Sequence, residues 1–240
     1  IKPEKSGPIK HYGSQATCAE PAMVAKLEEA IEKMQKQGNP SWLGLLSQWL
    51  QAIGVLRLKH IKRSTPMKLT SSTLHAWCHK GKQKNMRGGF KWSAPASFIS
   101  RPTFNWAKKF LDEWKKVPAV KRNKVGMAFD TEKFAPLTNK ACIDMARTAM
   151  GPLVTNEEEL STYSWRRVMP TLGLAAHFSG TEMMALGDWQ DKSMGGKEVS
   201  DAKMPLHYSD NKEELSKRIK HEAAIILGSI MCFNVWEATP

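Results

Sequence analysis

The segment from residue 42 to residue 53 places the strongest constraint on the fold of this chain. Its large apolar side chains recur three or four residues apart, which gathers them on one side of an α-helix. They are Trp42, Leu45, Leu46, Trp49 and Ile53. A chain of 240 residues is long enough to bury such a helix, in one large domain or in one of two small ones.

The same helical spacing recurs elsewhere, and one segment departs from it. Further helices are predicted at 20–37, 104–116, 138–150 and 213–236, with two short helices after residue 163. Together with a small β-hairpin, they predict a mainly α protein of the α+β class. The longest apolar run, 223–236, is too short to span a bilayer, so we expect no membrane insertion.

The period changes from helical to alternating after Thr70. Leu74, Ala76 and Cys78 alternate with more polar or aromatic neighbours, which predicts a half-buried strand. A partner strand is expected at 90–93, after a basic turn. The basic residues of this turn are Lys80, Lys82, Lys84 and Arg87. They are candidates for contacts with phosphates, although a solvated turn explains a charge run equally well.

Cysteine and histidine residues do not predict a metal site. His75, Cys78 and His79 are of metal-ligand type, but Cys78 and His79 face opposite sides of a strand and no second ligand pair follows. Cys18, Cys142 and Cys232 are isolated, so we expect reduced thiols in an intracellular compartment. The chain begins without a methionine, which suggests a fragment or a processed chain.

Charge favours a polyanionic partner. Lys and Arg number 36 against 23 for Asp and Glu, a formal net charge of +13. Nucleic acid is the first candidate and an acidic membrane surface the second. The alternative is a basic protein without a polyanionic partner. Residues 118–126 are predicted to form a basic linker in which Lys121, Arg122 and Lys124 contact backbone phosphates.

Residues 163–208 contain the types needed to hold a phosphodiester and attack it. Ser164 is predicted to cap a helix, which would place Arg166, beside Arg167, in the first turn, where backbone N–H groups favour anions. Trp189 follows the second short helix, and its indole N–H can donate to a phosphate oxygen. The alternative to phosphate binding is that the arginines are ordinary surface charges and that the tryptophan fills the core.

The order of these features resembles the tyrosine recombinase/integrase superfamily, closest to its divergent eukaryotic mobile-element members. The resemblance rests on Arg57 after an apolar helix, a lysine on a hairpin, Arg166-Arg167 with Thr171, Gly187-x-Trp189 and a late tyrosine. It implies a recombinase catalytic-domain fold from about Trp42 to the C-terminus. It also implies DNA cleavage and rejoining through a 3′-phosphotyrosine, without a metal, ATP or other cofactor.

The resemblance also implies a role for each matching residue. Arg57 and Arg166 would clamp the scissile phosphate, and Lys82 or Lys80 would protonate the leaving oxygen. Trp189 stands where the family has His or Trp, and Tyr208 would be the nucleophile. Double-stranded DNA would be the partner of a homo-oligomer, in the nucleus. The alternative for Arg57 is a side chain that reaches the surface from a core helix.

Several positions depart from the family pattern. Tyr163 occupies the position of the histidine three residues before the second arginine, and a phenol is a poor base because its unperturbed pKa is about 10. His60 replaces an acidic residue, and the segment between Trp189 and Tyr208 is longer than usual. Two alternatives therefore stay open, a catalytically decayed DNA-binding relic of the same fold and a basic helical scaffold protein.

The resemblance divides the chain into three parts. Residues 1–19 are expected to be a flexible leader, and residues 20–40 a helix left from the family's DNA-clamping domain. Residues 41–240 would form the catalytic domain. The last helix docks on its own or a neighbouring protomer in relatives, and we expect it to pack within the same chain.

Overall fold

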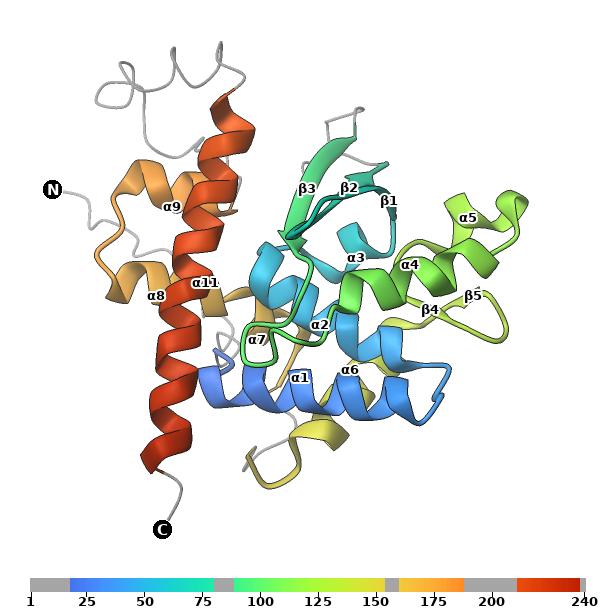
Figure 1. The fold of residues 1–240 in the computed structure, drawn as a ribbon, viewed down its shortest axis with the longest axis horizontal. Helices are drawn as coiled ribbons and strands as arrows, with labels where there is room; N and C mark the ends of the chain where they lie inside the picture. The colour runs from blue at the N-terminus through green and yellow to red at the C-terminus, as the bar shows by residue number, and fades with distance from the viewer. Residues whose placement is uncertain (1–17, 80–88, 154–159, 188–210, 238–240) are drawn as a thin grey trace, which may run out of the picture.

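The computed structural model describes residues 18–79, 89–153, 160–187 and 211–237 (Figure 1). The helices are α1 (Pro21–Lys36), α2 (Trp42–Gly54), α3 (Leu58–Ile61), α4 (Trp106–Lys116), α5 (Ala119–Val125), α6 (Asn139–Met150), α7 (Thr162–Arg166), α8 (Val168–Ala175), α9 (Gly180–Gly187) and α11 (Asn211–Glu237), with a 3-10 turn η1 (Gly151–Leu153). The strands are β1 (Ser64–Leu69), β2 (Thr73–Cys78), β3 (Phe90–Pro95), β4 (Phe129–Asp130) and β5 (Ala135–Pro136). This mainly helical fold with a small antiparallel sheet confirms the predicted α+β class.

Helix α2 is the centre of the core, and all of its residues are buried. It packs against α1, α6 and α7, and also against β3 and β4. Trp49 lies at the middle, with its ring centroid 5.1 Å from that of Phe98 and 5.5 Å from that of Trp106. The predicted core helix is therefore confirmed. Burial extends beyond the predicted stripe and includes Gln48 and Gln51 on the same helix.

A buried carboxylate fastens α1 to this core. Glu28 of α1 accepts hydrogen bonds from Trp49 Nε1 at 2.7 Å, from the Ile99 backbone N at 2.9 Å and from the Ser100 backbone N at 2.8 Å. The Ser100 hydroxyl donates a further bond to the same carboxylate. Burial raises the pKa of Glu28, while these hydrogen bonds act in the opposite direction.

The three-stranded sheet has the order β1-β2-β3, and both pairings are antiparallel. Strands β2 and β3 form the predicted pair, with Leu74 opposite Ala94 and Ala76 opposite Trp92. Strand β1 was not predicted. It contains Pro66, and its pairing with β2 is irregular between Pro66 and Lys68, so its side chains do not show a regular alternation of burial.

Residues 118–126 are not the predicted linker, because most of them form helix α5. Pro118 is the N-cap and only Val125 of the helix is buried, so the segment lacks an apolar stripe to reveal it. Lys121 and Lys124 are exposed. Arg122 donates from Nε to the Val117 carbonyl at 3.1 Å, which satisfies an acceptor just after the end of α4.

Gly126 ends α5 and lets two segments approach closely. Its φ of +61° and ψ of −159° lie in a region open almost only to glycine. A Cβ at this position would overlap the backbone carbonyl oxygen of Lys62. The following Met127 N donates to the Ile61 carbonyl at 3.2 Å, so the chain after α5 is fixed against the end of α3.

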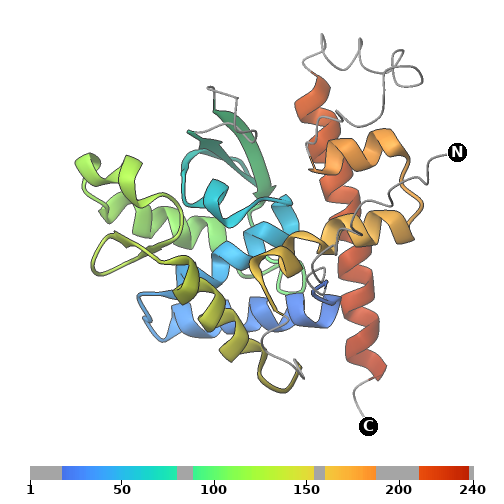
Figure 2. The same ribbon diagram turned by 180° about the vertical axis from the view of Figure 1, so that it is seen from behind.

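Helix α11 lies beside α8 and α9 at one side of the molecule, as two opposite views show (Figures 1 and 2). Its buried side chains Ile219, Ala223, Leu227 and Met231 recur every four residues, which is the spacing of one helix face. The helix thus packs within its own chain, as expected. None of the helices in the described part of the chain combines the length and apolar character needed to cross a bilayer.

Candidate functional site

Three stretches that are far apart in the sequence line one pocket of about 210 Å³. Its lining residues are Gln51, Arg57, Leu58, Lys59, Asn139, Thr162, Tyr163 and Arg166. They come from α2, from α3 with its N-cap, from α6 and from α7. Three of them carry a positive charge, and none of the described residues that line the pocket is acidic.

Arg57 stands at the turn between α2 and α3, as the N-cap of α3. Helix α2 ends because Val55 adopts a left-handed conformation, with φ 53° and ψ 32°. The Arg57 side chain is only half-buried, but its Nε is buried and has no hydrogen-bond partner among the described residues. A buried donor left unpaired costs about 1–3 kcal/mol, so this group favours an acceptor brought by a ligand.

Arg166 enters the pocket from the end of α7. Its Nε donates to the Val55 carbonyl at 3.0 Å, which links α7 to the turn before Arg57. Burial lowers the pKa of Arg166, and the nearby charge of Arg57 lowers it further, whereas Tyr163 acts in the opposite direction. Two guanidinium groups that repel each other across one pocket make the site strongly positive. A bound anion would relieve this repulsion.

The start of α7 differs from the prediction. The N-cap is Ser161, whose side chain accepts from Tyr163 N at 3.2 Å, so the prediction that Ser164 caps the helix is wrong. Ser164 lies inside the helix, is buried and accepts from Ser161 N through its hydroxyl at 3.0 Å. Arg166 is consequently the last residue of α7 rather than part of its first turn, so helix N–H groups do not assist it there.

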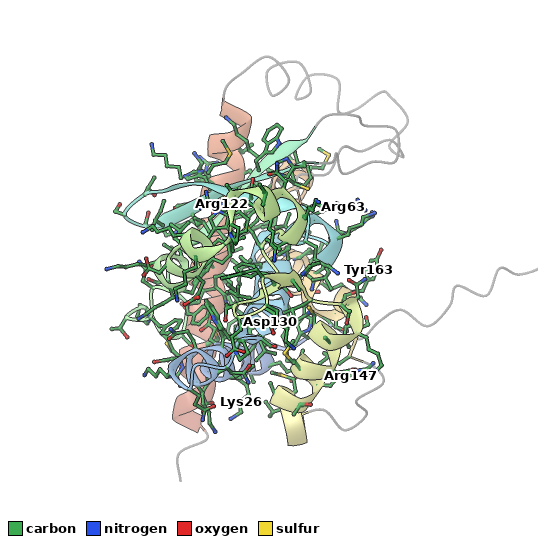
Figure 3. All side chains as sticks on the ribbon, turned by 90° about the vertical axis from the view of Figure 1, so that its right-hand side faces the viewer. Lys26, Arg63, Arg122, Asp130, Arg147 and Tyr163 are labelled. Carbon is green, nitrogen blue, oxygen red and sulfur yellow. The ribbon has the colours of Figure 1, made fainter. Side chains whose placement is uncertain are left out.

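Tyr163 lies at the surface opening of this site. The residue is 54% exposed, and Figure 3 shows it at the same edge of the molecule as Arg63. The backbone is held by Ser161, and the next residue but one, Trp165, is buried in the core. The phenol is therefore carried on a fixed turn and is accessible from solvent.

Five pocket residues were not predicted, and one of them, Leu58, is a buried apolar side chain of α3. Lys59 is exposed and lies two residues after Arg57, but an isolated surface lysine gives no distinctive signal. Gln51 is buried and donates to Gln48 Oε1 at 2.8 Å. The only feature of the sequence that could have indicated its role is that it is a polar residue on an apolar helix. Asn139 accepts from Lys62 Nζ at 3.1 Å. Asn139 and Thr162 join the site only through tertiary packing.

The structure brings together three of the predicted site residues, namely Arg57, Tyr163 and Arg166. Arg167 is half-buried between α7 and α8 and is not among the lining residues. The same holds for Lys121, Arg122 and Lys124, which lie on α5. The remaining predicted residues lie outside the described part of the chain: Lys80, Lys82, Lys84, Arg87, Trp189 and Tyr208.

Among the described residues, no group of three or more His, Cys, Asp or Glu side chains is placed to hold a metal ion. Comparison with protein-family models, with curated proteins and with solved structures finds no match.

Proposed function

We propose that this pocket binds a phosphodiester of double-stranded DNA, in a protein that cleaves and rejoins DNA strands through a phosphotyrosine intermediate. The observation that carries the proposal is the meeting of Arg57 and Arg166 in one pocket, with a buried Arg57 Nε that lacks a partner among the described residues. Guanidinium groups bind phosphate oxygens through paired N–H donors, and they stabilise the charge that develops at phosphorus during transfer.

The order of elements supports a recombinase-like fold as part of this proposal. Arg57 follows the apolar helix α2, the antiparallel strands β2 and β3 come next, and Arg166 comes later on a helix. The sequence resemblance implied this order and implied that the two arginines converge. It also assigns the covalent attack to Tyr208, which lies outside the described residues.

Charge supports a nucleic acid over a small anion. The net charge of +13 greatly exceeds what one phosphate requires. Beside the pocket, α3 and the residues after it carry Lys59, Lys62 and Arg63, and Arg63 lies at the same edge as Tyr163 (Figure 3). Phosphate contacts of this kind give most of the affinity for duplex DNA and make it depend on salt.

The test is the salt dependence of duplex binding, measured by fluorescence anisotropy with Arg57→Gln. Loss of a charge-assisted hydrogen bond costs about 1.5–3 kcal/mol, so the dissociation constant should rise about 10- to 150-fold. The slope of log K against log salt should fall in magnitude by about 1.

Arg101→Gln is the matched control for this test. It removes the same charge, but Arg101 pairs with Glu32 at 3.0 Å and is not among the pocket residues. Equal effects of the two substitutions would contradict a phosphate site at the pocket. Pocket-dependent binding without any covalent adduct on nicked DNA would instead support the decayed, DNA-binding relic.

A further inference from the structure

A tyrosine side chain lies in the same pocket as the two arginines. Tyr163, Arg57 and Arg166 all line it. Burial and the charge of Arg57 lower the pKa of Arg166, whereas Tyr163 acts in the opposite direction. The tyrosine is also 54% exposed, so a phosphate of DNA can reach it without rearrangement of the core. This combination of a phenol, two anion-binding groups and access is what attack on a phosphodiester requires.

We infer that Tyr163 is itself the nucleophile that forms the phosphotyrosine, in place of Tyr208. This inference rests on the proposed function, because it needs a phosphodiester bound between Arg57 and Arg166. It changes the role expected for Tyr163. By its position in the sequence, Tyr163 replaces the family's histidine, which contacts the phosphate. A phenol is a poor base at neutral pH but a competent acceptor of a phosphoryl group, and the second role suits tyrosine better.

The proposed step is balanced in bonds and protons. The Tyr163 oxygen bonds to phosphorus while the bond from phosphorus to the departing nucleotide oxygen breaks. The phenolic proton passes to solvent, and the departing oxygen takes a proton from the ammonium group of Lys59, which solvent restores. No oxidant, reductant or nucleotide is consumed, and reversal of the step rejoins the strand. Arg57 and Arg166 hold the nonbridging oxygens and stabilise the added charge at phosphorus.

The local structure suits a fixed nucleophile. Ser161 and Ser164 hold the first turn of α7 as a capping box, in which each hydroxyl accepts from the backbone N of the other residue, and Trp165 anchors the same turn in the core. The Arg166 hydrogen bond to Val55 fixes the other end of α7 against the turn that leads to Arg57. The nucleophile and the clamp are thus joined by short, packed segments, and such preorganisation lowers the entropic part of the barrier.

The experiment is incubation of the full chain with a nicked duplex that traps a covalent adduct, followed by trypsin digestion and mass spectrometry. The chain has three tyrosines, Tyr12, Tyr163 and Tyr208, so the assignment can be exhaustive. Cleavage after Arg147 and Arg166 gives a peptide that contains Tyr163 alone among them. A nucleotide mass on this peptide would support the inference, and the same mass on the peptide of Tyr208 or Tyr12 would overturn it.

Substitution of each tyrosine by phenylalanine tests the assignment without depending on recovery of the modified peptide. We expect Tyr163→Phe to abolish the adduct, Tyr208→Phe to retain it, and Tyr12→Phe to match the wild type. Loss of the adduct in Tyr208→Phe with retention in Tyr163→Phe would refute the inference and leave the proposed function standing. Absence of any adduct despite Arg57-dependent DNA binding would also refute it. Absence of Arg57-dependent binding would refute the proposed function itself.

Discussion

Replacement of Gly126 by alanine should be among the most destabilising single-methyl changes in this protein. Two effects combine at this position. The backbone conformation, φ +61° with ψ −159°, is one that alanine adopts only with strain. In addition, the new Cβ would overlap the Lys62 carbonyl oxygen, which is backbone and cannot move aside as a side chain can.

The expected magnitude follows from these two effects. Backbone strain of this kind costs about 1–3 kcal/mol. Displacement of a packed neighbour typically costs about 1–3 kcal/mol more. The sum, about 2–6 kcal/mol, is a large part of the 5–15 kcal/mol by which a folded protein is typically stable. Because Lys62 donates to Asn139 in the pocket wall, the displacement should also weaken DNA binding.

Gly151→Ala separates the two effects. Gly151 also has a positive φ, +49° with ψ −124°, but a Cβ there would meet no heavy atom of the described residues within 4 Å. It should show the strain alone, about 1–3 kcal/mol. Urea denaturation followed by far-ultraviolet circular dichroism measures both variants. If Gly126→Ala lost no more stability than Gly151→Ala, the close approach to Lys62 would not be a packing constraint.

Three further predictions concern Glu28, Glu32 and Arg166. Glu28→Gln should lower the free energy of unfolding by about 1–3 kcal/mol, because an amide cannot accept all of the bonds that the carboxylate accepts. The exposed neighbour provides the control in the same urea assay: Glu29→Gln should change stability by less than about 1 kcal/mol. The hydrogen bond from Lys36 lowers the pKa of Glu32, so its stabilisation is present above the ordinary pKa of 4.5 and is lost as pH falls through the lowered value. Thermal melts of wild type and Glu32→Gln from pH 7 down to pH 3 should therefore converge on acidification, and a constant difference would contradict this assignment. Arg166→Lys should raise the dissociation constant for duplex DNA by about 10-fold or more, since a lysine cannot both bond the Val55 carbonyl and fork to phosphate; unchanged anisotropy titrations would argue against the clamp.

The parts of the fold that the sequence predicted are those with a clear apolar period. Helix α2 has a large apolar residue at nearly every inward position, and β2 alternates strictly between buried and half-buried residues. Strand β1 and helix α5 lack such a period. The first is interrupted at Pro66, and the second buries only Val125. Their conformations depend on neighbours that are distant in sequence.

In the candidate site, too, some residues could be predicted from the local sequence and others depend on tertiary packing. Ser161 and Ser164 are both suitable N-caps, and the choice depends on which hydroxyl turns inward, which the buried position of Ser164 decides. The order of motifs was enough to propose Arg57 and Arg166 as partners. Asn139 could not have been proposed, because its place in the pocket comes from the packing of α6 on α2.

The left-handed turn at Val55 has a consequence for synthesis of the protein. The Val55 carbonyl accepts a hydrogen bond from Arg166, which lies 111 positions later in the chain. At typical translation rates, about 6–22 s separate the appearance of the two residues at the ribosome. A β-branched residue is costly in this conformation without support. Nascent chains should therefore hold Arg57 in an unfinished turn until Arg166 has been synthesised, and competence to bind a polyanion should follow that step.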